Sequence, residues 1–139
     1  MVNPLLTGMK LLAVVGLLVA VQACSDQRDE AAKAFFLSYE QDVACGASEE
    51  ELLEYFVASS TSERYVESVV TARDYQWGDI QEHCEAFDMQ GAMHNVEIRW
   101  LTEQRAQVWG RTTDLGEMSQ IDGIYLIREG NDFRLQVGE

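Results

Sequence analysis

The sequence predicts an α+β fold, in which N-terminal helices pack on one face of a curved antiparallel sheet of about four strands. Apolar residues recur at helical spacing from Asp29 to about Gly91, and they alternate with polar residues from Val96 to Val137. Helices followed by an antiparallel meander are typical of the α+β class. A short apolar segment at the front of the chain predicts a cleaved signal peptide ahead of this domain.

That apolar segment runs from Leu11 to Val21, where every residue is apolar or Gly, and Lys10 precedes it. A helix that spans a bilayer needs roughly 20 apolar residues, so this segment is too short to be a membrane anchor. Its length and its positive flank are those of a signal-peptide core. Met9-Lys10 would also make a natural start, which leads to the hypothesis that residues 1–8 are an upstream start-site extension.

The end of the segment, Val21-Gln22-Ala23-Cys24, resembles the lipobox of bacterial lipoproteins, with Val in place of the commoner Leu. The resemblance implies that residues 1–23 are removed, that Cys24 carries lipid, and that residues 24–28 form the tether. Two or three acyl chains hold a protein stably on a membrane, whereas one chain holds it only marginally. The alternative is an ordinary leader that ends near a buried cysteine.

The residue after the predicted lipidation site is Ser25, and in this the chain resembles outer-membrane lipoproteins. An Asp at that position favours the inner membrane in enterobacterial lipoproteins, and here Asp26 comes one residue later. The expected location is therefore the outer membrane, facing the periplasm, with the inner membrane as the alternative.

The chain is strongly acidic beyond the leader. From residue 24 onward it holds 24 acidic and nine basic residues, a formal net charge of −15. Such a surface repels phosphate backbones and anionic lipid headgroups, because nucleic-acid binding depends on clusters of Lys and Arg. We expect no nucleic-acid partner. The simplest interpretation is that the negative charge keeps the protein soluble and its self-association weak.

With Cys24 assigned to lipid, Cys45 and Cys84 remain as an even pair in an oxidising compartment. They are predicted to form a disulfide that closes a loop of about 40 residues and contributes roughly 4 kcal/mol on the chain-entropy model. The alternatives are two buried free thiols or a functional cysteine. His83 adjoins Cys84 and His94 is isolated, so no zinc-like ligand set is present and no metal is expected.

The first predicted helix covers Asp29 to Ala44, with Gly46 expected to end it. Its apolar residues fall on one side at helical spacing: Ala32, Phe35, Phe36, Tyr39 and Val43.

Two capping signatures predict the next helices. Ser48 with Glu51 three residues later begins a helix whose apolar face is Leu52, Leu53 and Phe56. The same pattern at Ser60 and Glu63 begins another, with a core face of Tyr65, Val66, Val69 and Val70. Asp79 and Glu82 predict a further short helix that carries Ile80, Cys84 and Phe87 and is closed by Gly91.

Four strands are predicted after Gly91, where the apolar period changes from 3.6 to 2. Their alternating segments are Val96–Trp100, Ala106–Gly110, Ile121–Ile127 and Phe133–Val137. In the third strand we place Ile121, Gly123, Tyr125 and Ile127 on one face, opposite Ile124 and Leu126. The stretch Glu129–Asp132 is typical of a tight hairpin turn.

The order of elements resembles the cone-shaped fold of the nuclear transport factor two-like superfamily, also called ketosteroid-isomerase-like or cystatin-like. The resemblance covers roughly Asp29 to Val137, on "AAKAFFLSYEQDV", "SEEELLEYF" and the closing "GIYLIREGNDFRLQV". Phe133 stands where Trp is commoner, and the family's strand between the early helices and the later helix is not obvious. The resemblance implies a cone whose open end often forms an apolar pocket, used for isomerisation, dehydration or ligand binding. It also implies a possible homodimer through the sheet.

The strongest enzymatic candidate is "RDYQWGD", residues 73–79, which gathers Asp74, Tyr75 and Trp77 near a helix end. A carboxylate beside aromatic rings in a pocket can act as a base with a raised pKa. The simpler alternative, which we favour, is a helix end with a packing aromatic. Isomerase chemistry needs a carboxylate base that faces an oxyanion-stabilising group. No such set can be placed, so no catalytic residue and no cofactor is assigned.

The sequence therefore predicts a leader (1–23), a lipidated tether (24–28) and a single α+β domain (29–139). The expected function is that of a non-enzymatic envelope lipoprotein that binds an envelope protein or an apolar small ligand. The alternative is a small-molecule enzyme of the isomerase or dehydratase type. Fold alone does not decide between them.

Overall fold

The computed structural model describes residues 27–138, apart from the side chain of Asp122. Contacts divide the chain after Ala31, and the fold below is that of the unit Ala32–Glu139, which takes in nearly all of the predicted domain. The predicted leader and Cys24, the predicted lipidation site, lie outside the described residues. Within residues 27–138, none of the helices is long and apolar enough to cross a membrane.

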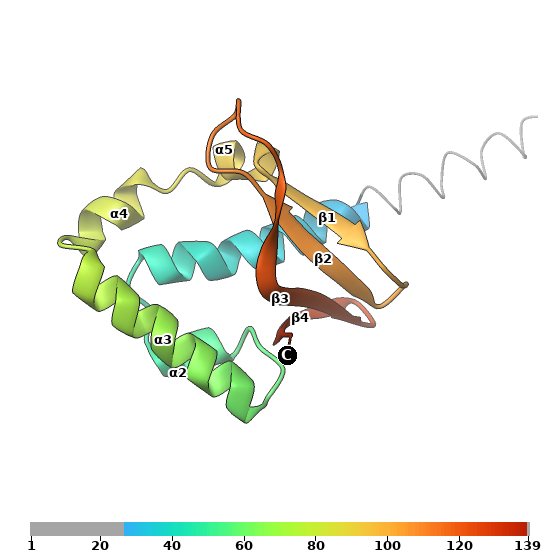
Figure 1. Cartoon of the computed structure of the whole chain (residues 1–139), viewed down its shortest axis with the longest axis horizontal. Coiled ribbons are helices and arrows are strands. Elements are labelled where there is room, and N and C mark those ends of the chain that lie inside the picture. Colours follow the sequence, from blue (N-terminus) through green and yellow to red (C-terminus); the bar gives the residue numbers. More distant parts are fainter. Residues whose placement is uncertain (1–26, 139) are drawn as a thin grey trace, which may run out of the picture. The chain divides into compact units, whose positions relative to one another are not determined.

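Helices come first along the chain and strands follow (Figure 1). Residues 27–44 are helical, and the later helices are α2 (Glu49–Leu53), α3 (Ser60–Gln76), α4 (Ile80–Ala86) and α5 (Met89–His94). The strands are β1 (Val96–Trp100), β2 (Arg105–Gly110), β3 (Ser119–Glu129) and β4 (Asp132–Val137). They form one antiparallel sheet in the order β1-β2-β3-β4. The predicted α+β class is confirmed.

The core lies between the helices and one face of this sheet. The first helix contributes Ala32, Phe36, Tyr39 and Val43, all buried, at the predicted helical spacing. Alternate residues of all four strands meet them, and the strand residues between are half-buried or exposed. The buried strand residues are Val96, Ile98, Ala106, Val108, Ile124, Leu126, Phe133 and Leu135.

Phe56 departs from its predicted place in the second helix. That helix ends at Leu53, and Phe56 forms a single parallel bridge with Leu135 beside β4. The N–H of Leu135 donates to the carbonyl of Tyr55 at 2.7 Å, and the N–H of Val57 donates to the carbonyl of Leu135 at 2.8 Å. The edge strand thereby gains backbone partners, which a continued helix would not supply.

The predicted cap at Ser48 is confirmed, because its side-chain oxygen accepts from the N–H of Glu51 at 3.2 Å. The predicted cap at Ser60 is off by one residue. Ser59 has the extended backbone of a cap and accepts from the N–H of Ser62 at 3.0 Å, so Ser60 is the first helical residue. Ser59 and Ser60 are adjacent, so the sequence pattern alone does not show which of them is the cap.

Gly91 does not close the short helix that follows Asp79. Asp79 does cap α4 as predicted, accepting from Gln81 and Glu82, but that helix ends at Ala86. Gly91 lies inside a separate helix, α5, where its backbone is ordinary. The sequence stretch read as one helix with a glycine stop is two helices.

The third strand contains an irregularity that changes its face assignment. Gln107 pairs with Tyr125 but Trp109 pairs with Gln120, so β3 holds extra residues opposite β2. Gly123 sits in this bulge with φ +79°, a conformation that glycine adopts without strain. Ile121 consequently packs against the core while Tyr125 lies under the guanidinium of Arg105 at 4.0 Å, so the prediction that they share a face is wrong.

The predicted disulfide between Cys45 and Cys84 is present and joins the end of the first helix to α4. The hairpin turn is also confirmed, with Glu129 paired to Asp132 and Gly130 at φ +64°.

Candidate functional site

The three candidate residues from the sequence do not converge on one cavity. Asp74 is exposed and pairs with Arg73, its carboxylate 3.0 Å from the guanidinium Nε. Tyr75 is 91 % exposed on α3. Trp77 is partly buried and lies over the ring of His83, with centroids 4.5 Å apart.

The buried member of that sequence motif is Arg73, which is only 5 % exposed. Its Nη1 donates to the carbonyls of Val43 at 3.2 Å and Ala47 at 2.8 Å, at the end of the first helix. A cation at a helix C-terminus is favourable, since the last carbonyls lack helical partners. Arg73 therefore joins α3 to the end of the first helix.

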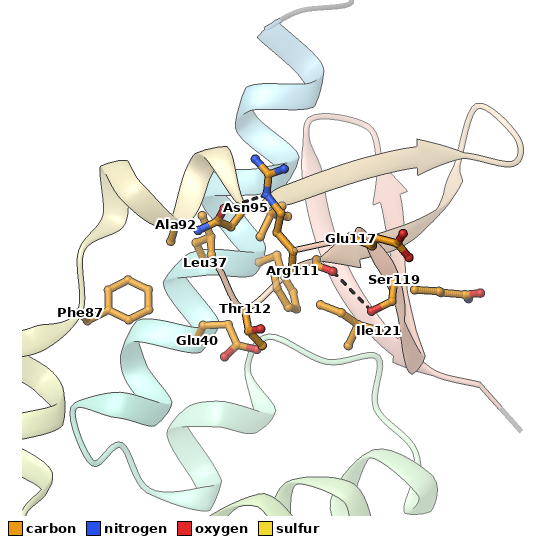
Figure 2. A pocket seen from close by; sticks show the side chains of 14 residues that line it. Leu37, Glu40, Phe87, Ala92, Asn95, Arg111, Thr112, Glu117, Ser119 and Ile121 are labelled. Carbon is orange, nitrogen blue, oxygen red and sulfur yellow. Dashed lines mark hydrogen bonds between the residues drawn. The ribbon is translucent and has the colours of Figure 1, made fainter. Parts of the chain in front are cut away.

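A cavity of about 490 Å³ opens elsewhere, between the first helix, the α4–α5 segment and the bulged end of the sheet (Figure 2). Its walls are largely apolar and include Phe36 and Leu37 from the helix, Phe87 from the segment after α4, and Val96 and Ile121 from the sheet. The irregularity in β3 is what directs Ile121 to this side.

The rim of the cavity is polar and comes mainly from the chain between β2 and β3. Thr112, Glu117 and Ser119 contribute exposed side chains there. Arg111 is held at the edge, because its Nε donates to Asn95 Oδ1 at 3.0 Å and its Nη2 donates to the carbonyl of His94 at 3.1 Å. Figure 2 shows its guanidinium turned toward Asn95 and away from Glu40.

Glu40 is the titratable side chain that enters the cavity from the helix wall. It is half-buried, and it lines the cavity together with Phe36, one helical turn earlier. Burial raises the pKa of its carboxyl above the usual value, since the charged form loses hydration. A carboxyl in this setting can hold a proton, release it to a base, or pair with a cation.

A second groove, of about 310 Å³, shares Glu40 and lies between the first helix and α3. Tyr39, Tyr65 and Trp77 supply its aromatic walls. Burial raises the pKa values of Tyr39 and Tyr65, and the charge of Glu40, which lines the same groove, raises both further. Both tyrosines therefore stay protonated near neutral pH.

Sequence reasoning missed Glu40, although a signal was present. Glu40 follows Phe36 by four residues and so lies on the same face of the predicted helix. An acidic residue next to the apolar stripe of a helix is a candidate for burial, although the spacing of that stripe alone predicts only packing.

Comparisons of the chain with protein-family models, with curated proteins and with solved structures find no match. Within the described residues, no group of three or more His, Cys, Asp or Glu side chains is arranged to hold a metal ion. The assignment of function rests on the cavity and on the sequence motifs.

Proposed function

We propose that the protein is a membrane-anchored lipoprotein of the bacterial envelope, whose domain binds a small ligand with an apolar body. The lipobox-like Val21–Cys24 supports an acyl anchor on Cys24 after removal of the leader. Ser25 favours the outer membrane, with the domain in the periplasm. The disulfide between Cys45 and Cys84 fits an oxidising compartment.

The observation that carries the binding role is the cavity itself. Pockets for small molecules usually measure about 300–1,000 Å³ and combine apolar walls with a few polar groups. The cavity between the first helix and the sheet has this size and this lining, with Phe36, Leu37 and Phe87 in its walls. A small ligand accounts for it more directly than a partner protein does, because the lining is concave and largely apolar.

The same cavity fits the proposed relationship to the nuclear transport factor two-like superfamily. In that fold a cone formed by helices and a curved sheet often encloses an apolar pocket at its open end. We propose a cone-like arrangement here, with the bulge at Gly123 supplying curvature in the sheet.

One observation favours a second candidate, a small-molecule enzyme of the isomerase type. Glu40 lies in the cavity and has a raised pKa, as a general base working near neutral pH requires. A β,γ-unsaturated cyclic ketone is a suitable probe, because moving its double bond requires proton transfer at carbon. Isomerisation that Glu40→Gln abolishes would favour the enzyme over the binding protein.

Binding of N-phenyl-1-naphthylamine, an uncharged apolar fluorophore, tests the proposed cavity directly. Ala92→Phe places a ring into the cavity lining, whereas Ala86→Phe makes the same change at an exposed position at the end of α4. We expect the first variant to weaken binding at least about tenfold and the second to leave it unchanged. The ligand-binding role is wrong if the fluorophore does not bind or binds both variants equally.

A further inference from the structure

We infer that the ligand of this cavity is an organic cation, a protonated amine on an apolar body, and that Glu40 supplies its counter-charge. This inference rests on the proposed ligand-binding function and adds the chemical class of the ligand.

Glu40 has no hydrogen-bond or charge partner among the residues that the structure describes. Among residues 27–138 no donor forms a hydrogen bond with its carboxylate, and no Lys, Arg or His pairs with it. Glu40 is half-buried, and a carboxylate that loses part of its hydration costs free energy unless a cation pairs with it. An ammonium group would supply both the missing charge and the missing N–H donors.

The cations nearest the cavity and its neighbouring groove are engaged elsewhere. Arg111 on the rim of the cavity donates to Asn95 and to the His94 carbonyl. Arg73 in the neighbouring groove donates to the first helix and pairs with Asp74. Both guanidinium groups are held by other partners, so a cationic ligand could pair with Glu40 without competing with either of them.

Aromatic side chains line the cavity. Phe36 and Phe87 line it together with Glu40, and the neighbouring groove that shares Glu40 is lined by Tyr39 and Tyr65. Aromatic faces attract ammonium groups, and the attraction grows when the cation is removed from water. The walls therefore suit the apolar body of the ligand and the charge that it carries.

The electrostatic field of the whole domain also favours a cation. The mature chain carries a formal charge of −15, and Glu117 adds a second carboxylate at the rim of the cavity. A field of this sign raises the local concentration of cations and opposes the approach of anions. A carboxylate or phosphate ligand would meet this repulsion and would face Glu40 without a compensating cation.

The experiment compares three probes that share one ring and differ in their end group: 2-phenylethylamine, which is cationic, 2-phenylethanol, which is neutral, and phenylacetate, which is anionic. Dissociation constants are measured by calorimetry at pH 7 on the full-length protein. We expect the amine to bind at least about tenfold tighter than the alcohol, the ratio that a charge-assisted hydrogen bond gives over a neutral one, and phenylacetate to bind most weakly.

Glu40→Gln should weaken binding of the amine about tenfold and leave the alcohol unchanged. Glu103→Gln, an identical change at an exposed turn residue outside the cavity lining, should alter neither. Should the alcohol bind the parent protein as tightly as the amine, the cation assignment is wrong while the cavity remains a binding site. If the parent protein binds none of the three probes, the proposed ligand-binding function is wrong. The comparison of probes on the parent protein stands even if Glu40→Gln fails to fold.

Discussion

Removing the Cys45–Cys84 bridge is expected to cost the domain much of its stability. The two cysteines are 39 residues apart, so the bridge closes a long loop in the unfolded chain. The chain-entropy model gives about 4 kcal/mol for a loop of this length. For a domain of roughly 110 residues, that loss lowers the melting temperature by roughly 15 °C. The perturbation is the double variant Cys45→Ser/Cys84→Ser, which removes the bridge without leaving a free thiol.

The assay is thermal and urea unfolding of the parent and the double variant, each with and without dithiothreitol. Reductant should bring the parent to the midpoint of the double variant and should leave the double variant unchanged. Because α4 buries no residue of its own, hydrogen exchange in α4 should accelerate before the rest of the domain opens. A double variant within about 1 kcal/mol of the parent, with no effect of reductant, would refute the reasoning.

Three further changes test the core, a cap and the buried carboxyl. Leu135→Ala should cost roughly 2–5 kcal/mol in urea unfolding because the residue is fully buried, and Leu115→Ala, at a fully exposed position, should stay within about 0.5 kcal/mol; equal effects would contradict the assigned core. Ser59→Ala should cost about 1 kcal/mol while Ser60→Ala changes stability little, and the reverse order would restore the cap predicted from sequence. Glu40 has a raised pKa, so it stabilises the fold while protonated and loses that contribution as pH rises through the raised value. The stability of Glu40→Gln relative to the parent should therefore grow from about pH 4.5 upward, and a difference that does not change with pH would contradict the burial of this carboxyl.

Periodicity predicted most of the fold because the core is built from regular faces. Phe36 and Tyr39 on the first helix, and Val96 and Ile98 on β1, lie where helical and alternating spacing placed them. The sequence also paired the two cysteines correctly, since only these two remained once Cys24 was assigned elsewhere. Each of these inferences needed only local pattern or simple counting.

Two of the errors share a cause, which is that pairing between distant segments is not encoded locally. Phe56 leaves its helix because β4 offers backbone partners at Leu135. Ile121 changes face because of a register shift against β2 that no spacing within β3 reveals.

The same limitation hid the cavity. Glu40 and Ile121 are separated by most of the domain in sequence, and only the folded chain brings them to the same cavity. The motif at residues 73–79 is recognisable as a candidate site because its residues are neighbours in sequence. In the structure its buried member, Arg73, donates hydrogen bonds to the carbonyls of Ala47 and Val43, which lie 26 and 30 residues earlier in the chain.

Intact-mass spectrometry of the protein recovered from cells tests the central proposal most directly. An envelope lipoprotein should be found in the membrane fraction as a chain that begins at Cys24 and is heavier than residues 24–139 by a diacylglyceryl group and, in most molecules, one further acyl chain. A chain in the soluble cell interior that retains residues 1–23 and an unmodified thiol at Cys24 would contradict it.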